Sequence, residues 1–458
     1  MEHFCSEDIE SKRQEAGRKL IHLASEYGKK MVSPQTGYLH YYGFSASVHM
    51  TIPFLDNLHL ALLWMRMHTV ELVQAGKVLL DNLLKFETEG NFPVFLHEYP
   101  LCKDEYLPHK VYLPLAFIYK EFGPVLGQEL RLKVQAALDR VHTYCEANVS
   151  ISKLLHYKML CAQRLMGKLE KTPVFDGHYL MPEMHAEAAL AYYLTESSLK
   201  GQKLWDDLEK GWHTTTAAFA GPVRMGSQNK LYPQITAYEL LMWYLQGEVP
   251  HRTDLLESHS LLWASMLPLC CKDPVPHNAF NPIAITVADK PTALQSNEDY
   301  RFHPLYILWG SSAQPTTFTC QIEPQVRVTG NHSNGRTELL FTFEEEFSGN
   351  DDDKAKEVNF YFTRLPDQHP IMTVNGIKAS IFEEKDLFTI EYKDLNIKMH
   401  FEVLDDQGRF VAHLLPGNRP SQLVNFGGER FSVFDWQILL RTVTRNVDTK
   451  LKVIIEVN

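Results

Sequence analysis

The chain has 458 residues, of which 45% are apolar, 22% charged and 11% aromatic. These are ordinary globular values, so they exclude a wholly disordered or collagen-like chain and leave room for about two or three domains. The 45 Lys and Arg residues against 56 Asp and Glu residues give a net charge of −11, which is not the positive field of a nucleic-acid or anionic-membrane binder.

The seven cysteines are scattered without a C-x-x-C pair, so neither a disulfide framework nor a thiolate zinc site is predicted. The first residues lack the basic and apolar regions of a secretory signal. The longest uncharged apolar stretch is about eleven residues, against the roughly 20 that span a bilayer. We therefore expect a cytoplasmic protein with no membrane or nucleic-acid partner and no metal or other cofactor. Its oligomeric state is left open.

Residues 1 to about 270 carry apolar residues at helical spacing with almost no strand pattern. A polar amphipathic helix is expected over 6–31, and a long one over 56–87 that is either bent near Gly76 or broken near His68. Further helices are expected over 108–122, 126–147, 152–169, 182–195, 199–219, 233–246 and 253–268. Because the connections are short, neighbouring helices should be antiparallel, which predicts helical hairpins packed side by side.

From about residue 282 the apolar pattern changes to period two, as in the alternation of Leu339, Phe341 and Phe343. Similar runs occupy 358–363, 378–382, 387–392, 397–403, 409–415, 430–436 and 450–457. Turn residues separate them, and the pair Asn375-Gly376 is a specific hairpin signal. The sequence therefore predicts a connector and an antiparallel β-sandwich over 276–458.

Three helical-domain segments carry a family resemblance: GNFPVFLHEYP at 90–100, DGHYLMPEMHAEAALAYY at 176–193 and LYPQITAYEL at 231–240. Together with the order of the domains, they resemble polysaccharide lyases with an α/α toroid, such as the heparinase II/III-like and hyaluronate/chondroitin lyase families. The resemblance implies an α+β multidomain fold, with an α/α toroid of helical hairpins over 1–275 and a β-sandwich over 276–458. It also implies a carbohydrate-active protein that cleaves acidic, uronate-containing oligo- or polysaccharides by β-elimination. The chain departs from most such lyases in lacking a signal peptide.

Uronate cleavage requires a group that neutralises the carboxylate, a base that removes the α-proton and an acid that protonates the leaving oxygen. Histidine and tyrosine suit the base and the acid, and the candidates are His97, His178, His185, Tyr232 and Tyr238. Arg224 or Asn229 would neutralise the carboxylate. Substrate binding is assigned to these two residues together with Tyr41, Tyr42 and Tyr99, because aromatic rings stack on sugars.

Two other functions stay open. A glycoside hydrolase would use two carboxylates, for which Glu98, Asp104, Glu105, Glu183 and Glu187 are candidates. A non-catalytic protein could use the same aromatic residues to bind glycans or act as an interaction scaffold. A metal site at Glu183, His185 and Glu187 is disfavoured, because the spacing differs from the i, i+4 histidine pair of helical zinc sites.

Overall fold

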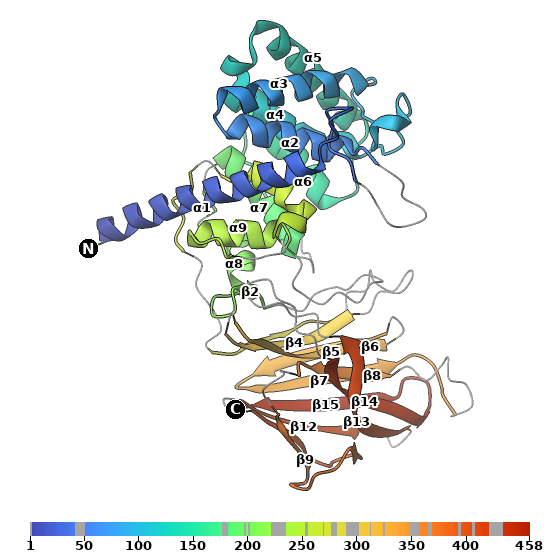
Figure 1. The fold of residues 1–458 in the computed structure, drawn as a ribbon. Coiled ribbons are helices and arrows are strands. Elements are labelled where there is room, and N and C mark those ends of the chain that lie inside the picture. The colour runs from blue at the N-terminus through green and yellow to red at the C-terminus, as the bar shows by residue number, and fades with distance from the viewer. Residues whose placement is uncertain are drawn as a thin grey trace. The chain divides into compact units, whose positions relative to one another are not determined.

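The structure is a computed structural model in which the chain forms two compact units. Unit 1 comprises Met1–Glu209 and Ile235–Pro276, and unit 2 comprises Lys210–Gln234 and His277–Asn458. The residues that the structure describes are 2–41, 51–175, 182–196, 198–199, 202–220, 235–251, 255–268, 270–275, 282–289, 302–311, 313–323, 326–348, 357–364, 369–392, 395–404, 408–420 and 434–458. Helices build unit 1 and antiparallel strands build unit 2, so the protein is α+β (Figure 1).

The helices of unit 1 follow one another in hairpin-like pairs. They are α1 (Glu2–Met31), α2 (Phe54–Arg66), α3 (Val70–Leu83), α4 (Leu107–Leu126), α5 (Gln128–Ala147), α6 (Lys153–Leu165), α7 (Pro182–Glu196), α8 (Lys203–Lys210) and α9 (Ala237–Gln246). Short 3₁₀ helices are η1 (Leu84–Phe86), η2 (Leu96–Glu98), η3 (Leu255–Glu257) and η4 (His259–Met266). Helix α2 packs on α3, α4 on α5 and α6, α6 on α7, and α7 on α9, while α1 packs on α9 and η4 (Figure 1). No described helix is both long and apolar enough to cross a membrane.

The long helix expected over 56–87 is two helices, and the break lies at His68 rather than at Gly76. His68 has a φ of 55°, which ends α2, and the Thr69 side chain then accepts a hydrogen bond from Leu72 N to cap α3. Gly76 instead lets the two helices cross closely, because a Cβ there would lie 2.7 Å from the carbonyl oxygen of Ala61. By contrast, the helix expected over 108–122 continues through Gly123 and Pro124 as α4, which ends at Leu126.

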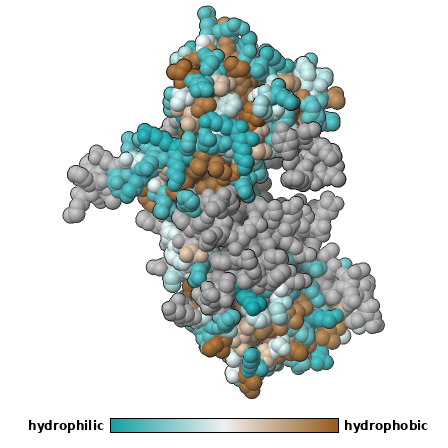
Figure 2. Space-filling view, in the orientation of Figure 1, coloured by the Kyte–Doolittle hydropathy of each residue, from teal (hydrophilic) through white to brown (hydrophobic). Residues whose placement is uncertain are grey.

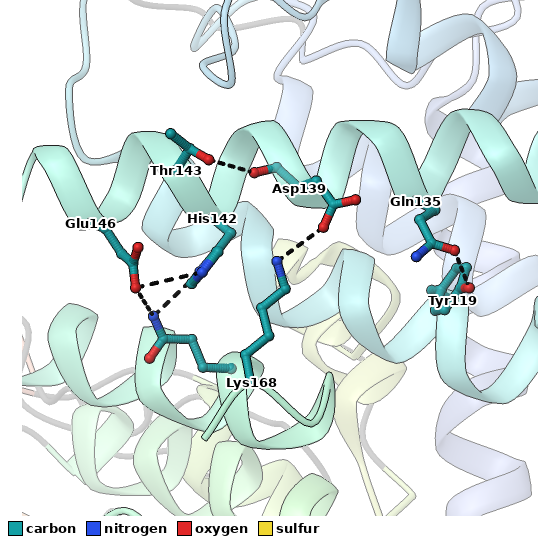
Figure 3. A network of polar contacts seen from close by, with 8 residues as sticks. Tyr119, Gln135, Asp139, His142, Thr143, Glu146 and Lys168 are labelled. Atoms are coloured by element: carbon teal, nitrogen blue, oxygen red, sulfur yellow. Dashed lines mark hydrogen bonds and ion pairs between the residues drawn. The ribbon is translucent and has the colours of Figure 1, made fainter. Parts of the chain in front are cut away.

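Polar side chains fix the outer helix α5 to its neighbours (Figure 3). Lys168 donates to Asp139 at 2.9 Å, and Gln163 of α6 donates to Glu146 at 3.4 Å. The Tyr119 hydroxyl of α4 donates to Gln135. These contacts are largely exposed, so they orient α5 more than they stabilise it, since exposed ion pairs contribute only about 0–1 kcal/mol each. The face of α1 seen in Figure 2 is mainly hydrophilic, as expected for a helix whose other face is buried.

A buried arginine joins α1 to the end of unit 1. The Arg13 side chain is 1% exposed and donates to the carbonyl oxygens of Leu245, Cys271, Asp273 and Pro274. The carboxylate of Asp273 accepts hydrogen bonds from Ser198, Tyr193 and the Leu199 backbone. This network satisfies backbone groups that would otherwise be buried without partners.

The strands of unit 2 form two larger antiparallel sheets and a small ribbon. They are β1 (Trp212–His213), β2 (Ala218–Phe219), β3 (Ala284–Val287), β4 (Phe302–Gly310), β5 (Pro315–Ile322), β6 (Val326–Ser333), β7 (Arg336–Phe343), β8 (Val358–Phe362), β9 (Ile371–Val374), β10 (Ile381–Phe382), β11 (Phe388–Tyr392), β12 (Leu395–Val403), β13 (Gly408–Pro420), β14 (Phe434–Arg445) and β15 (Lys450–Val457). The sheet orders are β10-β13-β14-β8-β5-β4-β3 and β6-β7-β15-β12-β11-β9.

Aromatic residues join the inner faces of these two sheets. Phe382 of β10 stacks on Phe388 of β11 with ring centroids 5.0 Å apart, and Phe343 of β7 lies 5.4 Å from Phe410 of β13. Buried and partly buried residues alternate along β12, so this strand turns one face towards the aromatic core.

The helix expected over 199–219 ends at Lys210, and the following residues form the β1–β2 ribbon of unit 2. The reason is local. Gly211 and the three successive threonines at 214–216 have low helix propensity, and β-branched residues favour extended backbone.

Candidate functional site

The segment Tyr38–Tyr41 is held against the start of α2 by one buried asparagine. The Asn57 side chain accepts from Leu39 N at 2.8 Å and donates to the carbonyl oxygens of Leu39 and Pro53. Tyr41 also pairs with Thr51 through two backbone hydrogen bonds. The Tyr41 side chain therefore lies beside the first turn of α2.

The segment Phe95–Tyr99 reaches the same side of unit 1. Leu96 N donates to the carbonyl oxygen of Ile52 at 2.9 Å. The Phe86 ring contacts both Tyr38, at 6.2 Å between centroids, and Tyr99, at 5.5 Å. Two of the segments predicted to supply aromatic residues thus meet at Phe86, and we name Tyr38, Phe86 and Tyr99 the aromatic surface cluster. Tyr99 is 47% exposed.

His97 is exposed and stacks on Phe95, with centroids 5.7 Å apart and nearly parallel rings. It lies on η2, and this contact orients the imidazole along the surface of the loop. The carboxylates predicted nearby have structural partners: Glu98 pairs with Lys103 at 3.2 Å, and Asp104 accepts from Tyr106 N at 2.8 Å.

A second group of side chains gathers where α6, α7 and α9 meet. We name Lys158, Glu183, Glu187 and Glu239 the carboxylate–lysine cluster. The Lys158 side chain is 4% exposed, and its ammonium nitrogen lies 3.0 Å from the Glu187 carboxylate. Its other neighbour is the Trp263 ring of η4, with the nitrogen 4.9 Å from the ring centroid. An ammonium over an indole face is stabilised by the ring quadrupole, so Lys158 has two sources of stabilisation.

Glu183 and Glu187 are four residues apart and therefore lie on one face of α7. The pKa of Glu183 is raised to about 7, mainly by burial and to a smaller extent by the nearby Glu239 and Glu187 carboxylates, against a backbone hydrogen bond that lowers it. The side chain of Glu239 is fixed because it accepts from the Thr236 backbone N–H at 2.8 Å in a capping box. Glu183 is thus a carboxyl group that exchanges a proton near neutral pH.

His59 of α2 extends this group across Trp263. Its ring centroid lies 5.0 Å from that of Trp263, and its Nδ1 is 2.7 Å from the Ser265 hydroxyl. Burial lowers the pKa of His59 to about 3, with a contribution from the positive charge of Lys158. The imidazole is therefore neutral at physiological pH.

His185 lies apart from the carboxylate–lysine cluster. It is two residues from both Glu183 and Glu187, which places it on the opposite side of α7. There its Nδ1 is 4.0 Å from Asp207, and its ring contacts Phe175 edge-on at 6.3 Å. Among the described residues, no group of three His, Cys, Asp or Glu side chains is arranged to hold a metal ion.

Tyr238 belongs to the core of α9. It is 1% exposed, its hydroxyl donates to the carbonyl oxygen of Leu208 at 2.8 Å, and burial raises its pKa. The other predicted residues lie outside the described part of the chain. They are Tyr42, His178, Arg224, Asn229 and Tyr232.

Sequence reasoning named Glu183 and Glu187 but missed Lys158, Glu239, His59 and Trp263. A signal was present for His59, because it is a polar residue within the otherwise apolar run LHLALLW. Lys158 is likewise a charge among Leu, Tyr and Met. Neither signal identifies which polar residues meet, because their helices are about 100 residues apart in the chain.

Comparisons with known proteins do not identify a family for this chain. No family model and no curated protein matches the chain. Among the solved structures that match is one described as heparinase III, which aligns over 95% of this chain and 84% of its own length, with 9% identity and a TM-score of 0.33. A likeness at that TM-score carries no argument about the site, so function is argued from the residues.

Proposed function

We propose that unit 1 is a carbohydrate-active enzyme that cleaves glycosidic bonds by acid–base catalysis, with Glu183 as the proton donor. The observation that carries this proposal is a Glu183 pKa of about 7 beside the Glu187–Lys158 ion pair. A carboxyl that stays partly protonated next to a charged carboxylate is the usual arrangement for an acid and its partner at neutral pH. Perturbed titratable groups cluster at functional sites.

Sugar binding is assigned to aromatic rings at and near this site. Trp263 is partly exposed, and the aromatic surface cluster lies on the same unit. Tyr41 and Tyr99 keep their proposed roles as substrate-binding residues, together with Tyr42. The proposed architecture is the one expected from the sequence, an α/α toroid followed by a β-sandwich.

β-Elimination on an acidic glycan is the first candidate reaction. Arg224 or Asn229 would neutralise the uronate carboxylate, and Tyr232 with one of His97, His178 and His185 would move protons. The protonated form of Glu183 supports this route, because it can protonate the leaving oxygen without repelling the anionic substrate.

Hydrolysis is the second candidate, and the pair Glu183 and Glu187 favours it. Glycoside hydrolases use one protonated and one ionised carboxyl on either side of the scissile bond. Three carboxylates against one lysine also make the cluster net acidic, which suits a neutral sugar better than a uronate.

The test incubates the purified chain with uronate-containing and neutral polysaccharides. An unsaturated product that absorbs in the ultraviolet indicates β-elimination, and new reducing ends without that absorbance indicate hydrolysis. Glu183→Gln should lower turnover by ~10²–10⁴-fold, as expected for loss of a general acid. The matched control is Glu129→Gln on α5, whose side chain is 85% exposed.

Full activity of the Glu183→Gln protein would contradict the role of Glu183. If no polysaccharide is cleaved, the enzyme proposal fails. Glycan binding that is lost in a Tyr232→Ala protein would then support a non-catalytic binder, and no binding would leave an interaction scaffold.

A further inference from the structure

The Lys158 side chain is enclosed between three elements of unit 1. It belongs to α6, and its ammonium nitrogen lies 3.0 Å from the Glu187 carboxylate of α7 and 4.9 Å from the centroid of the Trp263 ring of η4. Helix α7 packs on both α6 and η4 (Figure 1). Because only 4% of the Lys158 side chain is exposed, a substrate cannot reach the ammonium, which acts on the groups that surround it.

The partner of this lysine is more open. The Glu187 side chain is 19% exposed, and Glu183 is also partly exposed. Both belong to one face of α7, where residues one turn apart have Cβ atoms about 5–6 Å apart. That spacing is compatible with the separation of about 5–9.5 Å between the two carboxyl groups of glycoside hydrolases. A ligand can therefore meet both carboxyl groups without touching Lys158.

Further contacts hold the Trp263 ring. Its centroid lies 5.0 Å from that of the His59 ring of α2, and His59 Nδ1 is 2.7 Å from the Ser265 hydroxyl. These contacts form one series from the interior to the partly exposed carboxylate: Ser265, His59, Trp263, Lys158 and Glu187. An ammonium is costly to bury unless it is paired, and this one is paired with a side chain that a ligand can reach.

We propose that Lys158 is a positioning residue that acts through Glu187, and that Glu187 is the ionised carboxylate that works with Glu183. This inference rests on the proposed function and deepens its hydrolytic form, because it assigns the second carboxylate and the group that orients it. Trp263 supports Lys158 from the side opposite to a substrate-accessible carboxylate, through the attraction between an ammonium and an indole face.

Protons balance in the hydrolysis that these roles describe. Glu187 takes a proton from the water whose oxygen bonds to the anomeric carbon. The glycosidic C–O bond breaks, and Glu183 gives its proton to the leaving oxygen. Solvent then removes the proton from Glu187 and returns one to Glu183. Lys158 takes no part in these transfers, but its charge-assisted hydrogen bond stabilises the Glu187 carboxylate and fixes the direction of its oxygens.

The first test measures kcat and KM on the polysaccharide that the wild-type chain cleaves. Lys158→Met removes the ammonium but keeps an unbranched side chain against Trp263. It should lower kcat by ~10²-fold with little change in KM, because a displaced Glu187 no longer meets the reacting atoms. Lys158→Arg should recover most of the loss, since a guanidinium can pair with Glu187 and lie over the indole. The matched control is Lys168→Met, which removes an ammonium 2.9 Å from Asp139 and should keep the wild-type kcat.

A double variant tests whether Lys158 acts through Glu187. Glu187→Gln alone should lower kcat by ~10²–10⁴-fold, as expected for loss of a proton acceptor. Adding Lys158→Met to this variant should cause no further loss, whereas two independent effects would multiply. The double variant leaves neither charge of the pair without its partner, so it keeps the inference testable if circular dichroism shows that Lys158→Met alone does not fold.

The outcomes separate this inference from the proposed function. If Glu183→Gln is inactive while a folded Lys158→Met protein keeps the wild-type kcat, the inference is overturned and the function stands. A further loss of kcat in the double variant has the same meaning. An unsaturated product from the wild-type chain also overturns the inference alone, because the role of Glu187 belongs to hydrolysis. If the wild-type chain cleaves no polysaccharide, both are overturned.

Discussion

The two units bury different kinds of polar side chain. Among the described residues, unit 1 buries full charges: Arg13, Arg66, Lys158, Glu239 and Asp273. Unit 2 mainly buries threonines, namely Thr316, Thr317, Thr319, Thr337, Thr363, Thr442 and Thr449, with Arg445 and Asp435 as charged exceptions. Threonine satisfies its hydroxyl within a sheet, as Thr317 and Thr363 do across β5 and the end of β8 at 3.1 Å.

This difference shows where chemistry can take place. A buried charge is costly unless it is paired and hydrogen-bonded, so a cluster of such groups is retained for a structural or a functional reason. Arg13 and Arg66 have a structural one, because both donate to backbone carbonyl oxygens. The Glu187–Lys158 ion pair joins two side chains instead, and Glu183 lies one turn from Glu187 on α7, which is why the proposed site is in unit 1.

The largest expected change in stability concerns the buried arginines. Arg13→Met leaves four buried carbonyl oxygens without their donor and should lower the free energy of unfolding of unit 1 by about 3–5 kcal/mol. Arg445→Met in unit 2 should cost less, about 1–3 kcal/mol, because Met keeps the contacts with Phe343 and Phe347. Denaturant unfolding followed by tryptophan fluorescence measures both, and equal losses would contradict the comparison.

The next effect is the pH dependence that Glu183 gives to unit 1. Because Glu183 has a pKa of about 7 in the folded state, well above its ordinary value of 4.5, the folded state keeps a proton that the unfolded state has lost. The stabilisation that Glu183 contributes should therefore be lost as pH rises from about 4.5 to 7, by up to about 3 kcal/mol, while His59, whose pKa burial lowers to about 3, acts in the opposite direction. Glu183→Gln should remove this loss. Unfolding curves at pH 5 and pH 8 test it, and an unchanged pH dependence in the variant would disprove the raised pKa.

The smallest effect compares two glycines with positive φ, one in each unit. Gly90 has a φ of 88°, and a Cβ there would lie 2.5 Å from the carbonyl oxygen of Arg140. Gly376 has a φ of 79° with nothing within 4 Å. Gly90→Ala should cost about 2–3 kcal/mol from strain and contact, and Gly376→Ala about 1 kcal/mol from strain alone. Thermal midpoints of the two variants measure the difference, and a larger loss for Gly376→Ala would show that the backbone strain dominates.

Local signals predicted much of unit 2. The Asn375-Gly376 turn is confirmed: both residues have positive φ, and Val374 and Ile377 pair through two backbone hydrogen bonds. The run 450–457 is strand β15 with the expected bounds. Strands β4 and β5 were not identified, because nearly all of their residues are buried and such strands lack the alternation that marks a one-sided strand.

The sequence predicted which kinds of residue form the candidate site, but it did not predict which of them lie close together. It named Glu183 and Glu187, which lie on one face of α7, and His185, which lies on the opposite side of that helix near Asp207. The pKa of Glu183 depends on Glu239, more than fifty positions later in the chain. The spacing of apolar residues cannot predict a contact between residues so far apart in the chain, because it relates only residues within one helix or strand.

The sequence by itself determined the α+β composition, the change from helical to alternating pattern near residue 282 and the break at His68 as one of two alternatives. These features follow from helix and strand propensity and from the spacing of apolar residues, both of which depend on residues close together in the chain. Only the tertiary structure decided that Lys158 lies between Glu187 and Trp263, that His259 meets Tyr41, and that residues 210–220 join unit 2. Those contacts join helices and strands far apart in the chain, and they form because packing and desolvation favour one arrangement of the whole unit.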